Sequence, residues 1–133
     1  MLDKKARSEI YHENTKRADC SVVAAAAVSG LPYDEAEALL LETGYQVGEH
    51  TGAGAPRGTI ERALRSVGFK MESEWAEPGT TVATFWMTHR SRSTYLIYTD
   101  GHVCSLVNGK PYNFGTGYAL VESVTRVTRK ETT

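Results

Sequence analysis

The feature that most constrains this fold is an apolar run of ten residues, 20–29, in the first quarter of the chain. It reads CSVVAAAAVS, and its small aliphatic side chains would cover every side of a helix. A helix without a polar face is stable only when it is buried. Asp19 is a favourable N-cap and Gly30 a favourable terminator, so we predict a buried helix over 20–29.

Three further helices are predicted from apolar positions that recur with the helical period. One covers 33–43 and ends at Gly44, after which a loop rich in glycine follows over 44–58. The next begins with Thr59 as its cap and ends at Gly68. Its expected inner positions are Ile60, Ala63, Leu64 and Val67. A short helix is expected at about 81–89, with Val82, Phe85 and Trp86 on one face.

The second half of the chain has the composition of an antiparallel sheet. Residues 94–99, TYLIYT, are β-branched and aromatic, which is typical of a strand. Asp100-Gly101 and Asn108-Gly109 are hairpin turn signals on either side of HVCSLVN. A last strand is expected within 119–128. Helices followed by strands indicate an α+β fold, with N-terminal helices packed on a C-terminal antiparallel sheet.

Length and composition indicate one soluble domain. The chain has 133 residues, of which 41% are hydrophobic and 23% charged. We therefore expect a single domain over 1–133, with flexible ends at 1–10 and 129–133. No apolar run approaches the ~20 residues of a membrane span, and the N-terminal segment lacks the apolar centre of a signal peptide. These patterns favour a cytoplasmic protein without a membrane partner.

The charge pattern argues against a general nucleic-acid binder, because the formal net charge is −1. The basic cluster 89–92 is interpreted as a solvated turn, with a nucleic-acid patch as the alternative. No cofactor motif is present: the glycines near 52–58 match neither a dinucleotide fingerprint nor a P-loop. Asp100, His102 and Cys104 alternate near one strand, but they form no plausible tetrahedral metal set. We expect neither a cofactor nor a metal.

Cys20 is the candidate nucleophile. It starts the apolar helix, and the partial positive charge of a helix N-terminus favours the thiolate, the reactive form of cysteine. A buried core cysteine is the alternative interpretation. Asn14 lies six residues upstream. Its amide could pair with the Cys20 backbone N–H as an oxyanion hole, although asparagine is also a common turn residue.

His102 is the candidate general base, because it follows the Asp100-Gly101 turn and opens a strand, where a side chain can face a cleft. If Asn108-Gly109 is a two-residue turn, Val107 pairs with Lys110, and His102 and Asn113 share a face as diagonal neighbours. Asn113 could then accept the second imidazole N–H and fix the tautomer.

The remaining histidines and the second cysteine are weaker candidates for a catalytic role. His12 and His50 lie in presumed loops, and His89 continues an apolar helix stripe, so it is interpreted as structural. Cys104 shares the His102 face and is interpreted as a core thiol. Its alternative role is as a redox partner that switches Cys20 off.

These motifs resemble the papain-like cysteine peptidases, and more narrowly the compact single-domain versions that bacteriophages and bacteria encode. The resemblance covers about residues 11–128 and rests on Asn14, Asp19-Cys20, Gly101-His102-Val103 and Asn108-Gly109-Lys110-Pro111-Tyr112-Asn113. Cys, His and Asn follow one another in the family's order. Asp19-Cys20-Ser21 resembles bacterial cell-wall endopeptidases of the same superfamily, which usually carry a histidine at the position of Asn113.

The resemblance implies that Cys20 attacks a carbonyl, His102 transfers the proton and Asn113 orients His102. We therefore expect a cysteine hydrolase, a peptidase or isopeptidase acting on a peptide or protein through a thioester. Deamidase and acyltransferase chemistry would use the same residues. The alternative is a catalytically inactive binding protein on the same fold, such as a phage factor that blocks a host protein.

Overall fold

The computed structural model describes residues 20–44, 57–89, 93–100, 102–114 and 117–130. This part of the chain is α+β, with four helices and a five-stranded antiparallel sheet. The helices are α2 (Cys20–Ser29), α3 (Tyr33–Thr43), α4 (Arg57–Ser66) and α5 (Val82–Thr88). The strands are β1 (Phe69–Glu74), β2 (Thr94–Thr99), β3 (His102–Val107), β4 (Lys110–Tyr112) and β5 (Ser123–Arg129).

The sheet has the order β1-β5-β2-β3-β4, and every neighbouring pair is antiparallel. β3 and β4 form the predicted hairpin, in which Val107 pairs with Lys110. Asn108 and Gly109 between them have φ values of 52° and 81°, as a type I′ turn requires. The two-residue turn predicted from the sequence is confirmed, and it fixes the register of the strands that surround His102.

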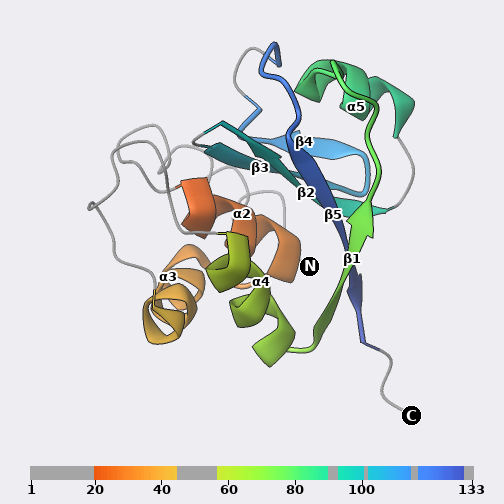
Figure 1. The fold of residues 1–133 in the computed structure, drawn as a ribbon. Coiled ribbons are helices and arrows are strands. Elements are labelled where there is room, and N and C mark those ends of the chain that lie inside the picture. Colours follow the sequence, from red (N-terminus) through yellow and green to blue (C-terminus); the bar gives the residue numbers. More distant parts are fainter. Residues whose placement is uncertain (1–19, 45–56, 90–92, 101, 115–116, 131–133) are drawn as a thin grey trace.

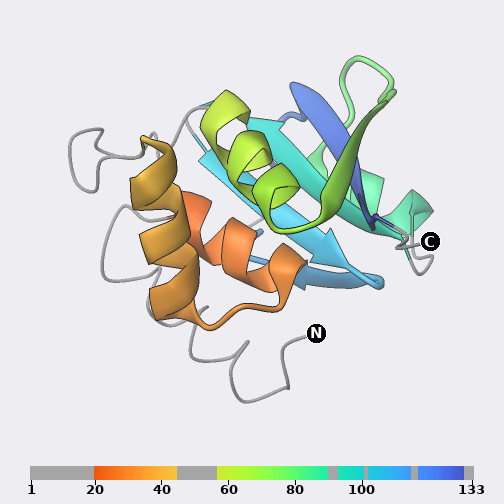
Figure 2. The same cartoon turned by 90° about the horizontal axis from the view of Figure 1, so that it is seen from below.

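Helices cover both faces of the sheet (Figures 1 and 2). Alternate residues of the central strands belong to two separate buried clusters. Leu96, Tyr98 and Val103 face α2, α3 and α4, whereas Ile97 and Cys104 face α5. Because side chains in a strand alternate between faces, the two clusters lie on opposite sides of the sheet.

α2 is buried along its whole length, as its composition predicts. It contacts α3, α4 and the strand β3, so it has protein on every side. The alanines at its centre allow these neighbours to approach closely, and Ala26 is completely buried. Contacts with the sheet and with two other helices thus hold α2, the helix that carries Cys20, in place.

A buried carboxylate joins α4 to two strands. Glu61 is 7% exposed, and its Oε2 accepts hydrogen bonds from Tyr98 in β2 at 3.0 Å and from Thr125 in β5 at 2.8 Å. Its other oxygen lies 3.7 Å from the Arg65 guanidinium. Buried carboxylates are costly unless they are hydrogen-bonded, so these donors make Glu61 tolerable and fix α4 on the sheet.

The helix predicted between Thr59 and Gly68 is present as α4, but both of its predicted ends are wrong. α4 begins at Arg57, so Thr59 lies inside the first turn and is not its cap. The helix ends at Ser66, and the chain turns through Gly68, which has a φ of 96°. Val67 therefore leaves the inner stripe and is 38% exposed.

Two features of the sheet differ from the prediction. β1 was not expected, and its insertion with α5 before the other strands breaks the simple order of helices followed by strands. β5 begins at Ser123, inside the expected range 119–128, but it extends to Arg129, which pairs with Phe69 inside the segment that was expected to be a flexible end. Residues 119–121 instead run beside the start of α5, where Val82 donates to the Ala119 carbonyl.

None of the helices in the described ranges is long and apolar enough to cross a membrane.

Candidate active site

Cys20 is the first residue of α2, at the end of the helix where backbone N–H groups have no acceptor within the helix. The partial positive charge at this end stabilises a thiolate. The side chain is 5% exposed. Because α2 is packed on all sides, the sulfur has a fixed position close to the surface of the core.

His102 is the first residue of β3, and its side chain hydrogen-bonds that of Cys20. Strand alternation assigns His102 to the face that α5 covers, whereas Cys20 belongs to the core on the opposite face. The two side chains meet because His102 lies at the end of the strand and is only half-buried, so its ring is not enclosed between the sheet and α5. The sequence predicted these two residues as partners, and the structure brings them together.

The second nitrogen of the imidazole is held by the main chain. Nε2 of His102 lies 3.0 Å from the carbonyl oxygen of Asn113. A carbonyl oxygen only accepts, so Nε2 must carry the proton that is donated. Nδ1 is then the nitrogen that is left to accept a proton from the Cys20 thiol. This contact fixes the tautomer that a general base requires.

The electrostatics around Cys20 favour the thiolate. Burial by itself raises the pKa of the thiol, because desolvation penalises the charged form. Hydrogen bonds from the His102 side chain and the Val103 backbone, the charge of His102 and the Ser21 hydroxyl lower it. These contributions outweigh burial, and the pKa of Cys20 lies below its ordinary value of 9.0.

The pKa of His102 is shifted the opposite way, above its ordinary value of 6.5. The hydrogen bond with Cys20 raises it most, burial lowers it, and the Asn113 carbonyl and the negative charge on Cys20 raise it further. The two shifts have the same origin, since each charged partner stabilises the other. The pair therefore favours transfer of the proton from sulfur to imidazole.

Asn113 contacts His102 in a different way from the one predicted. The sequence predicted that its side-chain amide would accept from the imidazole, but the acceptor at 3.0 Å is its main-chain carbonyl oxygen. β4 ends at Tyr112, and Asn113 adopts a left-handed conformation with a φ of 63°. The regular ladder therefore stops before the residue, and its backbone turns out of the strand.

Several predicted residues lie outside the described part of the chain. These are Asn14, His12, His50 and residues 45–56 of the glycine-rich loop. The proposed oxyanion partner of Cys20 and the proposed cleft wall stay predictions. Arg90 and Arg92 of the basic cluster also lie outside the described residues.

Cys104 is a core thiol. It is 1% exposed, and its sulfur donates to the Ile97 carbonyl at 3.7 Å. Burial, followed by the charge of Cys20, raises the pKa of Cys104 to about 12. Both cysteines are free thiols in this structure. Cys104 is thus protonated at neutral pH and is a poor nucleophile.

His89 has a structural position, as its place in the helix stripe suggested. Its ring stacks on Phe85 with centroids 3.8 Å apart, and Nδ1 lies 2.9 Å from the Phe85 carbonyl oxygen. In the described ranges, no three His, Cys, Asp or Glu side chains are grouped so that they could hold a metal ion.

Two contributors to the site were not predicted. The Val103 backbone and the Ser21 hydroxyl both hydrogen-bond the Cys20 sulfur. Ser21 is completely buried beside Cys20 in the otherwise aliphatic helix, and this polar residue was the available signal. The Val103 contact has no sequence signal, because any residue supplies a backbone N–H.

Comparisons of this chain with protein-family models, with curated proteins and with solved structures gave no match. The functional argument therefore depends on the geometry and electrostatics of the Cys20–His102 pair.

Proposed function

We propose that this chain is a papain-like cysteine hydrolase, a peptidase or isopeptidase with Cys20 as nucleophile and His102 as general base. The observation that supports the proposal is the hydrogen bond between these side chains, with the pKa of Cys20 lowered and that of His102 raised. Perturbed pairs of this kind are characteristic of catalytic sites. The substrate would be a peptide or protein in the cytoplasm, which is the host cytoplasm if a phage encodes the chain.

The reaction would begin with transfer of the thiol proton to Nδ1 of His102. The Cys20 thiolate adds to the carbonyl carbon of an amide, and the carbonyl electron pair moves onto oxygen. The Cys20 N–H and the Asn14 amide would stabilise this oxyanion. Nδ1–H then protonates the leaving amine as the carbon–nitrogen bond breaks, and a thioester remains.

Water would complete the cycle. His102 removes a proton from water, the resulting hydroxide attacks the thioester, and the carbon–sulfur bond breaks to release the acid and the thiolate. Throughout these steps the Asn113 carbonyl keeps its hydrogen bond to Nε2–H. Two other reactions would use the same residues: capture of the thioester by an amine, and attack on a glutamine side chain. Because the three reactions give products of different mass, mass spectrometry distinguishes hydrolase, transferase and deamidase.

The first experiment measures the reaction of Cys20 with iodoacetamide at pH 7 by intact and peptide mass spectrometry. We expect single labelling at Cys20 and a rate that falls about tenfold or more in His102→Ala, because one pKa unit changes the thiolate fraction tenfold. Cys104→Ala is the matched control and should react like the parent protein. A Cys20 rate that is unchanged in His102→Ala would contradict the pairing.

The second experiment tests turnover. The protein is incubated with a mixed-sequence peptide library, and new termini are identified by mass spectrometry. We expect products that disappear in Cys20→Ser and fall about 10²–10⁴-fold in His102→Ala. A library that stays intact while Cys20 reacts rapidly with iodoacetamide would contradict peptidase activity on unfolded peptides, and ubiquitin-like conjugates would then test the isopeptidase form.

A second candidate is a non-catalytic binding protein on the same fold. The observation that favours it is the 5% exposure of Cys20, which is low for a nucleophile that must meet a polypeptide. This candidate predicts slow alkylation of Cys20 and no dependence on His102. The iodoacetamide experiment therefore separates the two functions.

A further inference from the structure

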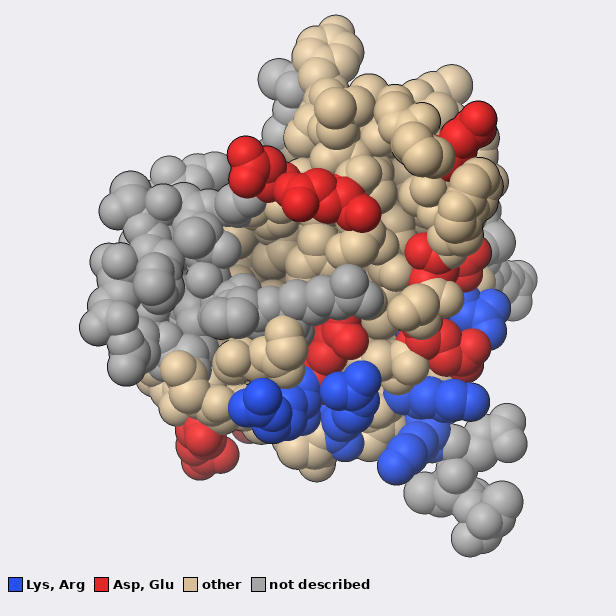
Figure 3. Space-filling model, in the orientation of Figure 1, with Lys and Arg blue, Asp and Glu red and all other residues tan. Residues whose placement is uncertain are grey.

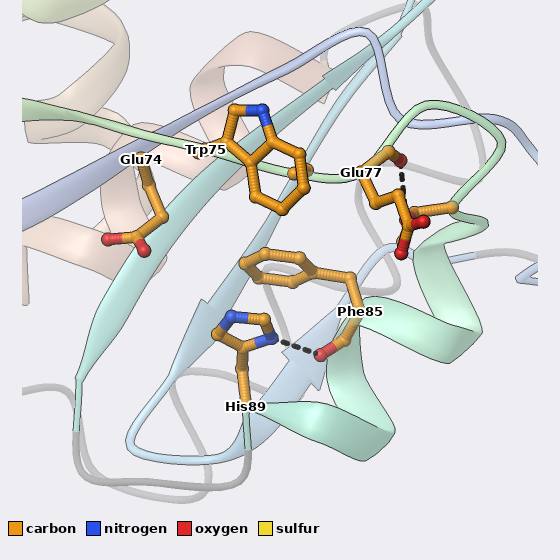
Figure 4. Close-up of a pocket in the computed structure, with 7 residues that line it drawn as sticks. Glu74, Trp75, Glu77, Phe85 and His89 are labelled. Atoms are coloured by element: carbon orange, nitrogen blue, oxygen red, sulfur yellow. Dashed lines mark hydrogen bonds between the residues drawn. The ribbon is translucent and has the colours of Figure 1, made fainter.

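A pocket of about 330 Å³ lies on the α5 side of the sheet, away from α2. The end of β1, the segment that leads into α5, and α5 with its C-cap all contribute to it (Figure 4). The lining side chains that matter for its chemistry are aromatic or acidic: Trp75, Phe85, His89, Glu74 and Glu77. This pocket takes no part in the Cys20–His102 site.

The aromatic wall of the pocket is rigid. Phe85 is fully buried, and His89 stacks on it with an interplanar angle of 10°. Tyr95 from β2 contacts both rings edge-on, with centroids 5.2 Å from Phe85 and 5.6 Å from His89. Phe85 has no exposed surface of its own, so the face that a ligand can reach is that of the half-buried His89 ring, which the stack holds in a fixed orientation.

Trp75 forms the opposite side of the pocket and is 75% exposed (Figure 4). An indole is the aromatic group that attracts cations most strongly, through the negative potential on its faces. This large side chain packs little against its own protein, so most of its surface is available to a ligand. The pocket thus has one exposed and one buried aromatic boundary.

The two carboxylates give the pocket its charge. Glu74 and Glu77 make no ion pair with a described residue, whereas the nearby Glu72 is paired with Lys70 and Arg126. Lys and Arg side chains gather along the lower edge of the face in Figure 3, whereas the charged side chains visible in its upper part are acidic. Within the described part of the chain, a cationic ligand would thus find two carboxylates here that no Lys or Arg side chain pairs with.

His89 adds a directed acceptor. Its Nδ1 lies 2.9 Å from the Phe85 carbonyl oxygen and 2.9 Å from the Thr88 hydroxyl oxygen. The carbonyl can only accept, whereas the hydroxyl can accept or donate, so both contacts are satisfied when Nδ1 carries the proton. Nε2 is then an acceptor, and it lies on the side of the ring toward Glu74 (Figure 4). A ligand with several N–H donors in one plane could use Nε2 and a carboxylate together.

We propose that this pocket binds an arginine side chain presented by a partner polypeptide. A guanidinium group is planar, stacks on aromatic faces and donates to carboxylates in a forked geometry. Its propyl stem would pack against Trp75. A lysine ammonium is a point charge with a tight hydration shell, so it would pair with the carboxylates but would not stack on the aromatic rings.

The test is a titration of ¹⁵N-labelled protein with the peptide acetyl-Gly-Arg-Gly-amide, followed through the indole N–H signals. The chain has two tryptophans, and Trp86 donates its indole N–H to the Gly109 carbonyl, so its signal serves as an internal control. We expect the Trp75 signal, assigned with Trp75→Phe, to shift with saturation. The citrulline peptide has nearly the same shape without the charge and should bind about fivefold more weakly or worse.

The variant control uses two pairs of isosteric changes. Glu74→Gln with Glu77→Gln should weaken the arginine peptide about fivefold or more, whereas Glu35→Gln with Glu42→Gln on the exposed side of α3 should leave binding unchanged. Equal affinity for the arginine and citrulline peptides, tighter binding of the lysine peptide, or an unshifted Trp75 signal would each overturn the proposal. Iodoacetamide labelling of Cys20 should be the same in all these variants, so failure here is distinct from failure of the proposed function.

Discussion

Burial and hydrogen bonding shift the pKa of the Cys20 thiol in opposite directions. Burial raises the pKa of the thiol, and the contacts with His102, Val103 and Ser21 lower it by more. The sequence allowed Cys20 and His102 to be chosen, because a helix start and a turn before a strand are both visible in the residue pattern. It could not reveal the Asn113 carbonyl contact, since a main-chain acceptor depends on conformation and not on residue type.

The pH dependence of alkylation follows from the sign of the Cys20 shift. The pKa of the folded thiol lies below 9.0, so the rate with iodoacetamide should reach half its plateau below pH 9.0. In His102→Ala the lowering contacts with the imidazole are lost while most of the burial remains, so the midpoint should move to higher pH. Rates measured between pH 5 and 10 give both midpoints, and an unchanged midpoint would contradict the assignment.

Position 113 distinguishes a main-chain role from a side-chain role. Asn113→Gly keeps the carbonyl and tolerates a φ of 63°, so Cys20 alkylation and its pH midpoint should stay close to the parent values. Asn113→Val resists this conformation at a cost of about 1–2 kcal/mol, so it should displace the carbonyl and raise the midpoint. Equal losses in both variants would assign the role to the amide side chain instead.

At the scale of elements, strong local signals predicted α2, α3 and the β3–β4 hairpin, and weak ones failed. β1, FKMESE, is a strand at the sheet edge with only Phe69 buried, so it has no continuous apolar alternation. The start of α4 was missed because Gly58 is a poor helix former and follows a glycine-rich segment. In both places tertiary packing supplies what the local sequence lacks.

The packing of α2 predicts a large difference between two alanine positions. Ala26→Leu inserts a larger side chain into a completely buried site and should lower the free energy of unfolding by about 1–3 kcal/mol. Ala38→Leu makes the same change on the exposed side of α3 and should alter it by less than about 0.5 kcal/mol. Urea denaturation followed by circular dichroism measures both, and similar values would show that α2 tolerates expansion.

At the scale of the whole molecule, Glu61 joins the helical layer to the sheet. Tyr98 and Thr125 both donate to one of its oxygens from different strands. This contact could not be predicted from the sequence, because a single glutamate in an amphipathic helix is usually solvated. Three segments distant in the chain meet here, so the contact forms only when the complete domain has folded.

Glu61→Ala should therefore destabilise the domain by about 1–3 kcal/mol, because two buried hydroxyls lose their shared acceptor. Glu61→Gln keeps an acceptor oxygen and should cost less. The exposed Glu42→Ala in α3 is the control and should be nearly neutral. Thermal and urea unfolding of the three variants provide the comparison, and a neutral Glu61→Ala would show that α4 is held by its apolar stripe alone.

The burial of α2 links chemistry to folding in one further respect. Its first residue is Cys20, so the sulfur is attached to a helix that is buried along its whole length, and buried elements open less readily than exposed ones. A bulky thiol reagent should therefore report cooperative unfolding events, while a small one reports the native state. The ratio of the two rates would make Cys20 a built-in gauge of interior stability that requires no added label.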